Sequence, residues 1–294
     1  MSGTRSIRGR VLEAGFAVAD RLEPHGFLPV TNRVRRMLGR YGADQHEVDI
    51  DGLTVSGSLA EHGNYLHQIS GSVVHPFQVG LFVDAIEPGA VVLDCGAHIG
   101  VLTLLAARAA GPEGKVIAVE PTPPNATALR RNISANGFDD RVELIEAAAA
   151  AEPGSAPLLI HLALDQSGTV PLPAPSERVI EVACVTLDEV MDGRGFDVAK
   201  IDIEGAEALA VAGLAETIAR SAGSTVFLEC HSSRLADGGV DPAVWVASLR
   251  DRGTLEIVDE QARVLIPAGD EQIAAAVRDH ELSFNLRWTL NPDQ

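Results

Sequence analysis

The 294-residue sequence has few cysteines and no long uninterrupted apolar segment. Its three cysteines, Cys95, Cys184 and Cys230, lie far apart, which excludes a disulfide framework and a Cys-x-x-Cys metal knuckle. Because all three stand in apolar, strand-like segments, we expect buried free thiols in a reducing cytoplasm. No apolar run approaches the length of a membrane span, and the charges within residues 11–30 argue against a signal peptide. The sequence therefore predicts a cytoplasmic protein without a membrane partner.

Positive charge is also scarce, since 23 Lys and Arg residues oppose 41 Asp and Glu residues and give a net charge of −18. A surface this acidic argues against a nucleic-acid partner, which would need clustered Lys and Arg side chains. Residues 1–40 are the exception, with eight arginines against three acids. We interpret this stretch as a solvated helical arm, although it keeps a macromolecular acceptor open as an alternative.

The sequence pattern changes near Pro88, where short apolar segments begin to alternate with segments of helical periodicity. The predicted strands include "AVVLDCG", "GKVIAVEP", "RVELIEAAAA", "APLLIHLAL", "RVIEVACVTL", "FDVAKIDIEG", "STVFLECH" and "SFNLRWTL". Among the helices predicted between these strands, one continuous helix spans "AEALAVAGLAETIARS". Strands that alternate with helices indicate an α/β fold with a doubly wound, mainly parallel sheet, in which ligands bind at the carboxyl ends of the strands.

Residues 1–72 lack this alternation and are predicted to be an N-terminal helical or irregular extension, which leaves residues 73–294 as the main domain. Within and next to the extension, "VRRMLGRY" and "HPFQVGLFVDAI" look helical, and "EVDIDGLTVSG" predicts a hairpin with an Asp-Gly turn. We expect the extension to act as a lid, a dimerisation segment or a substrate segment, so a homodimer is among the expected assemblies. His62, Tyr65 and His67 are candidates for a lid or substrate wall, with ordinary core or surface histidines as the alternative.

The turn "DCGAHIG" at residues 94–100 has two glycines four residues apart, which is not the G-x-G-x-x-G pattern of dinucleotide-binding turns. Ala97 and His98 occupy the space that a pyrophosphate would need. The free N–H groups of the following helix still favour an anion, whereas Asp94 favours a cation. A ligand with both an ammonium and a carboxylate fits this mixture, as the amino-acid end of S-adenosylmethionine does. The structural alternative is a simple packing turn.

The second predicted strand ends in Glu120-Pro121, 26 residues after Asp94. In nucleoside-binding sheets, an acid at this strand end accepts hydrogen bonds from the ribose hydroxyls. Such an acid is compatible with NAD or with S-adenosylmethionine, and the missing pyrophosphate glycine favours the latter.

The stretch from "VVLDCGAHIG" to "RRNISANG", followed by "AKIDIEGAEALAVAG", resembles the FkbM-type methyltransferases over roughly residues 73–232. The resemblance implies a class I S-adenosylmethionine-dependent enzyme with the seven-stranded, Rossmann-like methyltransferase fold. It implies that the cofactor lies among Asp94, Gly96, Gly100, Glu120 and Asn125. To these we add, as further predicted binding residues, Ala97, His98, Pro121, Ala147 and Asp202. His98 departs from the family motif D-x-G-A-N-I-G, where an asparagine stands, and either alters a hydrogen bond or adds a titratable group near the methyl donor.

Candidate catalytic residues stand at two further strand ends. "KIDIEG" supplies Asp202 and Glu204, which would share a face if the strand continues that far, and "FLECH" supplies Glu229 and His231. We favour a metal-free site in which these side chains form a base or position the acceptor. Two alternatives stay open. Asp202 and Glu229 could bind a divalent metal such as Mg²⁺, or the glutamates could cap a helix or pair with an arginine.

Together these features predict an O-methyltransferase that transfers a methyl group in line from S-adenosylmethionine to a hydroxyl of a small molecule, such as a natural product or a sugar. One alternative is an NAD-dependent oxidoreductase. It is disfavoured by the missing glycine pattern and by the lack of a Tyr-x-x-x-Lys pair in a chain with two lysines. The other alternative is a non-catalytic scaffold that binds S-adenosylmethionine.

Overall fold

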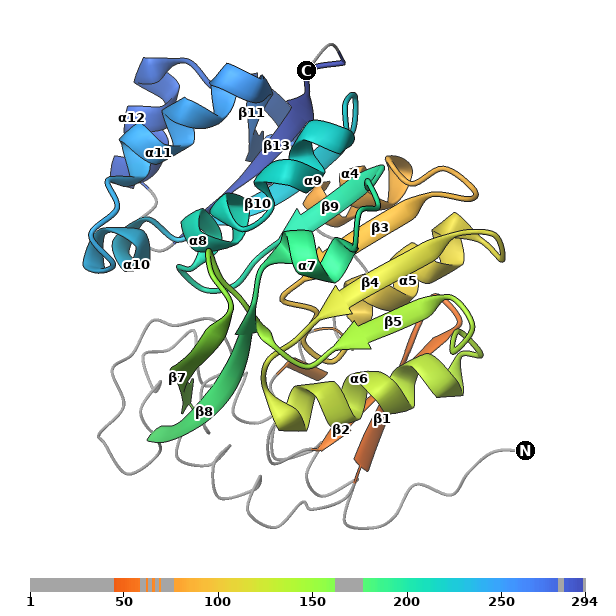
Figure 1. The fold of residues 1–294 in the computed structure, drawn as a ribbon. Helices are drawn as coiled ribbons and strands as arrows, with labels where there is room; N and C mark the ends of the chain where they lie inside the picture. The colour runs from red at the N-terminus through yellow and green to blue at the C-terminus, as the bar shows by residue number, and fades with distance from the viewer. Residues whose placement is uncertain are drawn as a thin grey trace, which may run out of the picture. The chain divides into compact units, whose positions relative to one another are not determined.

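The computed structural model describes residues 45–58, 62, 65–66, 69, 77–161, 177–279 and 283–292 (Figure 1). The chain splits into two compact units, one comprising Met1–Val73 with Leu159–Ile180 and the other Val74–Leu158 with Glu181–Gln294. The division into residues 1–72 and 73–294 stays a prediction, and the helix expected at "VRRMLGRY" lies outside the described residues. Within the described part of the chain, no helix combines the length and the apolar character needed to cross a bilayer.

The first unit contains a hairpin of β1 (Gln45–Ile50) and β2 (Leu53–Ser58), as the sequence predicts. Its turn residues, Asp51 and Gly52, have φ angles of 51° and 84°, and a two-residue turn of this hand needs positive φ at both positions. Nearby, Nδ1 of His62 accepts the backbone N–H of Ser58 at 3.1 Å. His67 lies outside the described residues, and the role of this segment as a lid stays a prediction.

The second unit is built on a large sheet, in which eight strands pair among the described residues. Across the sheet these strands are β12 (Val264–Pro267), β11 (Gly253–Asp259), β13 (Phe284–Leu290), β10 (Thr225–Cys230), β9 (Val198–Ile201), β3 (Val91–Cys95), β4 (Lys115–Val119) and β5 (Val142–Ile145). The five strands from β10 to β5 are parallel to their neighbours, and β13 lies antiparallel between β10 and β11. The predicted doubly wound, mainly parallel sheet is confirmed, with β12 as an edge strand beyond the seven expected.

Helices cover both faces of this sheet (Figure 1). They are α4 (Phe77–Asp84), α5 (Val101–Ala110), α6 (Pro123–Ala135), α7 (Leu187–Met191), α8 (Glu207–Ala212), α9 (Ala215–Arg220), α10 (Ser232–Asp237), α11 (Pro242–Ser248), the 3-10 helix η3 (Leu249–Arg252) and α12 (Asp270–Asp279). Successive strand residues point to opposite faces. Val92 therefore belongs to the core beneath α4 and α5, and Leu93 belongs to the core beneath α7 to α12. Because both faces are covered, the inner strands β3, β4 and β9 are almost entirely buried.

A smaller sheet follows β5 and has the order β6-β8-β7. Its strands are β6 (Ala148–Ala149), β7 (Gly154–His161) and β8 (Glu177–Val185), and the last two were expected as additional strands. β6 pairs in parallel with the end of β8, which leads the chain into α7 and then back to β9 in the main sheet.

The single helix predicted across residues 206–221 is wrong, because the chain breaks there into α8 and α9. At the break, the backbone of Gly213 lies so close to the turn after β6 that a Cβ atom would stand 2.1 Å from the carbonyl oxygen of Ala150. The carboxylate of Asp188 then accepts the backbone N–H groups of Glu216 and Thr217 and so satisfies the first turn of α9. Neither contact can be inferred from the helical periodicity of the sequence.

Phe227 provides a test of the core beneath α4 and α5. Its ring meets that of Phe82 edge-on, with centroids 5.8 Å apart, and both side chains are buried. We expect Phe227→Ala to lower the free energy of unfolding by about 3–5 kcal/mol, the usual cost of a large buried aromatic deletion. Val244→Ala is the control, since Val244 is 66% exposed and its removal should change stability by about 0.5 kcal/mol or less. Urea unfolding measures both values, and similar losses in the two variants would contradict the assignment of this core.

Candidate active site

The turn after β3 is fixed by glycines in backbone conformations that other residues rarely adopt. Gly96 and Gly100 have φ angles of 88° and 96°. A Cβ atom on Gly96 would stand 1.8 Å from the backbone oxygen of Asp202, and one on Gly100 would stand 2.3 Å from Cδ1 of Leu129. The two glycines therefore let the turn lie directly against the loop that follows β9 and against α6.

Asp94 is the last polar residue of β3 and is fully buried. Its Oδ2 accepts a hydrogen bond from the hydroxyl of Thr103 at 2.5 Å, and its Oδ1 is buried with no hydrogen-bond partner among the described residues. Burial raises the pKa of Asp94, while the positive charge of Lys200 opposes that rise. A buried acceptor without a donor is costly, and an ammonium group on a ligand would supply the missing donor.

Glu120 follows β4 and joins this turn to α6. Its Oε2 accepts the backbone N–H of His98 at 2.9 Å. Its Oε1 accepts the backbone N–H of Thr122 at 2.8 Å, the Thr122 hydroxyl, and the side-chain amide of Asn125 at 3.2 Å. Burial raises the pKa of Glu120. The three donors occupy Oε1, so Oε2 retains the capacity to accept from a ligand hydroxyl.

The remaining predicted cofactor residues lie at the same edge of the sheet. Ala97 is in the turn, where its N–H donates to the oxygen of Val119 at 3.1 Å, and Pro121 follows Glu120 directly. Ala147 is buried two residues after Ile145, whose oxygen accepts the N–H of Glu120 at 3.0 Å. The predicted cofactor residues thus gather at neighbouring strand ends, and their roles stay predictions.

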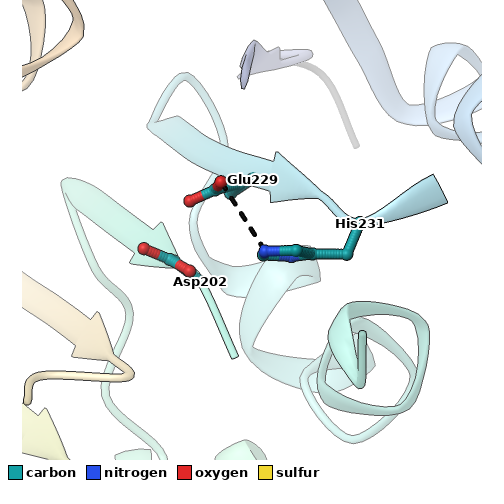
Figure 2. Close-up of side chains that lie close together, drawn as sticks. All are labelled: Asp202, Glu229 and His231. Carbon is teal, nitrogen blue, oxygen red and sulfur yellow. Dashed lines mark ion pairs between the residues drawn. The ribbon is translucent and has the colours of Figure 1, made fainter. Parts of the chain in front are cut away.

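The four candidate catalytic residues are brought together by the ends of β9 and β10. Figure 2 shows Asp202, Glu229 and His231 with their polar ends directed toward one another. His231 Nε2 lies 3.6 Å from Oε1 of Glu229 and 3.4 Å from Oε2 of Glu204. The convergence predicted from the two sequence segments is therefore present in the structure.

Asp202 and Glu204 do not share a strand face as expected, because β9 ends at Ile201. A turn follows, in which Glu204 and Gly205 have φ angles of 59° and 105°. Arg234 holds this turn, since it forms an ion pair with the Glu204 carboxylate and donates to the Glu204 backbone oxygen at 3.1 Å. The turn, rather than the pleat of a strand, therefore directs Glu204 toward His231. Glu204 also forms the ion pair with an arginine that was considered as the structural alternative.

Lys200 neutralises part of the acidic charge and was not among the predicted site residues. It lies on β9 in register with Asp94 on β3, and its Nζ donates to Oδ2 of Asp202 at 2.8 Å. Although burial opposes ionisation, Lys200 holds the pKa of Asp202 below its usual value. The signal was present in "KIDIEG", where residues two apart near a strand end lie on one side.

Glu229 and His231 both have shifted pKa values. Burial, followed by the negative charge of Asp202, raises the pKa of Glu229 to about 7. Burial lowers the pKa of His231, but the hydrogen bond to Glu207 and the charges of Glu229 and Glu204 outweigh burial and hold it above the usual histidine value. Two groups with shifted pKa values, Glu229 and His231, therefore lie side by side.

Asp202, Glu229 and His231 each offer an atom within 4.8 Å of the others, an arrangement that could hold a metal ion. The ammonium of Lys200 already contacts Asp202, so it would compete with a cation for the same carboxylate. The cluster therefore fits proton transfer better than metal binding.

Glu207 is a second residue that the sequence reasoning missed. It is the first residue of α8 and completely buried, and its Oε1 lies 3.0 Å from Nδ1 of His231. A glutamate in the first turn of a helix is common because it complements the helix dipole, so the sequence alone gave no reason to place it in a site.

Comparison with protein-family models matches residues 94–255, a little more than half of the chain, to the methyltransferase FkbM domain. Similar solved structures include an O-methyltransferase from Bacillus cereus in complex with SAH, at 15% identity over 78% of this chain and 87% of that chain, with a TM-score of 0.42. They also include a SAM-dependent O-methyltransferase from Thermotoga maritima, at 12% identity over 87% and 82% of the two chains, with a TM-score of 0.44. A putative rRNA-methylase from Clostridium thermocellum matches at 8% identity over 74% and 100%, also with a TM-score of 0.44. These TM-scores are low, and the strand order rather than the matches defines the fold.

The contact between Gly96 and Asp202 predicts an unusually costly alanine substitution. In Gly96→Ala the alanine would be strained by a positive φ, and its Cβ would clash with the backbone oxygen of Asp202. In Gly111→Ala the alanine would be strained by a φ of 70°, but nothing lies within 4 Å of its Cβ. We expect Gly111→Ala to lose about 1–2 kcal/mol from backbone strain alone. Gly96→Ala should lose clearly more free energy of unfolding in the same urea titration. Equal losses would show that the turn can move away from Asp202 without cost.

Proposed function

We propose, from the premise that the chain belongs to the FkbM methyltransferase family, that it is an S-adenosylmethionine-dependent O-methyltransferase acting on a hydroxyl of a small molecule. The observation that carries the proposal is the close contact between the Gly96 turn and the backbone of Asp202. It joins the predicted cofactor turn to the cluster around His231, so that a methyl donor and a proton acceptor would meet at one place.

The residues of the turn suit the amino-acid and ribose parts of S-adenosylmethionine. Asp94 offers a buried oxygen without a donor to the ammonium group, and Glu120 offers Oε2 to a ribose hydroxyl. The N-terminus of α5 offers N–H groups to the carboxylate. When bound, S-adenosylmethionine supplies a methyl group on a positively charged sulfur.

His231 is the proposed base. The acceptor oxygen has to lose its proton as it bonds to the methyl carbon, while the electron pair of the breaking carbon–sulfur bond stays on sulfur. We assign the proton to Nε2 of His231, where the carboxylates of Glu204 and Glu229 would stabilise the resulting imidazolium. Glu229 is the second candidate for the proton, because its pKa of about 7 also suits exchange near neutral pH.

The charge of the cluster supports a small, uncharged, hydroxyl-bearing acceptor, such as a sugar or a natural product. Four acidic side chains, those of Asp202, Glu204, Glu207 and Glu229, surround His231 against two cations, Lys200 and Arg234, and this excess of acidic groups would disfavour phosphates. The same charge disfavours a nucleic-acid acceptor.

Calorimetric titration with S-adenosylhomocysteine tests the cofactor assignment. Glu120→Gln should weaken binding by about 10–100-fold, because a hydrogen bond to a charged group is worth roughly 1.5–3 kcal/mol. Glu143→Gln is the control, since Glu143 lies on the neighbouring β5 and pairs with Arg194 instead. NAD serves as the control ligand. Unchanged affinity in Glu120→Gln, or binding of NAD in place of S-adenosylhomocysteine, would revive the oxidoreductase or scaffold alternatives.

Steady-state kinetics with an accepted hydroxyl substrate test the base. His231→Asn should lower kcat by roughly 10²–10⁴-fold, the usual contribution of a positioned general base, with little change in S-adenosylhomocysteine affinity. Because the base has to be unprotonated, kcat/KM of the unmodified enzyme should fall as pH decreases through a pKa above the usual histidine value.

The neighbouring exposed Ser233 provides the control, and Ser233→Ala should leave kcat unchanged. An equal loss of turnover and of cofactor affinity in His231→Asn would indicate a structural role for the histidine. Turnover that disappears in EDTA and returns with Mg²⁺ would favour the metal-assisted alternative.

A further inference from the structure

We infer that Glu207 is a positioning residue, which holds His231 as the tautomer protonated on Nδ1 and thereby leaves Nε2 as the proton acceptor. The inference rests on the proposed function, because it concerns how the proposed base is prepared. Glu207 lies behind the imidazole ring, on the opposite side from Glu204 and Glu229, since it contacts Nδ1 and they approach Nε2.

The direction of the hydrogen bond follows from what else Glu207 binds. Its Oε1 accepts the backbone N–H of Gly205 at 2.9 Å, and the same oxygen lies 3.0 Å from Nδ1 of His231. An oxygen that already accepts a backbone N–H acts here as an acceptor, so Nδ1 has to donate. A neutral imidazole has one N–H, and once that hydrogen is on Nδ1 the lone pair is on Nε2.

The two ring nitrogens also differ in their surroundings. The Glu207 side chain is 0% exposed, whereas those of Glu204 and Glu229 are 25% and 26% exposed. The distances from Nε2 to these two carboxylates, 3.4 Å and 3.6 Å, exceed the usual hydrogen-bond range. Nδ1 is therefore held on the buried side, and Nε2 faces the more open side without a short hydrogen bond to either glutamate.

The helix dipole at the start of α8 explains only part of why a negative charge stands at Glu207, because this side chain is completely buried. A glutamine could accept the Gly205 N–H equally well, and Oε2 of Glu207 is buried with no hydrogen-bond partner among the described residues. Burial of a carboxylate is costly unless it is paired, and His231 supplies a side-chain partner that gains from the charge. Asp202 also interacts electrostatically with the ring, since the two side chains offer atoms within 4.8 Å of each other, and Arg234 pairs with Glu204.

Nitrogen-15 NMR of the full-length protein tests the tautomer directly, without substrate or cofactor. At a pH well above the pKa of the ring, the His231 signals, assigned with His231→Asn, should report the hydrogen on Nδ1. Glu207→Gln retains an acceptor oxygen and should keep this tautomer. Glu207→Met removes the acceptor at similar volume and should move the hydrogen to Nε2, the nitrogen that usually carries it in water.

Turnover should follow the tautomer. Glu207→Met should lower kcat by roughly 10²–10⁴-fold, as loss of the base itself would, and Glu207→Gln should lower it less, which a purely steric role would not predict. Both variants should bind S-adenosylhomocysteine as the unmodified protein does. Asp188→Asn is the matched control, because it also neutralises a carboxylate that accepts two backbone N–H groups, and it should change neither tautomer nor kcat.

The outcomes separate this inference from the proposed function. Hydrogen on Nε2 in the unmodified protein overturns the positioning role of Glu207, even if His231→Asn abolishes turnover. A tautomer change in Glu207→Met with unchanged kcat overturns the base role of His231 and this inference with it. If Glu207→Met does not fold, a hydrogen on Nε2 in Glu207→Gln, or a kcat in Glu207→Gln as low as in His231→Asn with the Nδ1 tautomer retained, still contradicts the inference.

Discussion

The contact between the backbone of Gly96 and the carbonyl oxygen of Asp202 is the constraint on which the rest of the site depends. It brings the turn after β3 against the loop after β9, and no side chain larger than hydrogen fits between them. Every other part of the site is positioned relative to this contact. Glu120 reaches the turn through the N–H of His98, and Asp202 leads into the turn that carries Glu204 and ends at Glu207, the first residue of α8.

The cluster around His231 also illustrates how a protein keeps many acids close together. Lys200 and Arg234 each neutralise one carboxylate, those of Asp202 and Glu204 respectively. Burial and the negative charge of Asp202 raise the pKa of Glu229 to about 7, so that this carboxyl group is partly protonated near neutral pH. The result places Glu229, with a pKa of about 7, beside His231, whose pKa is held above the usual histidine value.

Much of the fold was predictable from the sequence, because strand and helix periodicities depend on local burial patterns. The strands β3, β4, β5, β9, β10 and β13 and the Asp51-Gly52 turn follow from such patterns, whereas β11 and β12 were not predicted. The break between α8 and α9 did not, because it depends on a carbonyl oxygen and a carboxylate that approach from distant parts of the chain. In the site, Asp202, Glu204, Glu229 and His231 were predictable as strand-end polar groups. Lys200 was recognisable two residues before Asp202 but was not predicted. Glu207 gave no signal, because its contact with His231 joins the start of a helix to a strand end.

The turn held by Arg234 has a consequence for how this protein can change by mutation. One arginine side chain binds the carboxylate and the backbone oxygen of Glu204, and it also packs where a Cβ atom on Gly205 would lie. Loss of Glu204 or of Arg234 therefore leaves the other with an unmatched charge, and a side chain at Gly205 would clash with Arg234. The effects of changes at these three positions should be strongly non-additive, and homologous sequences that lose one member of the trio should tend to have replaced the other two as well.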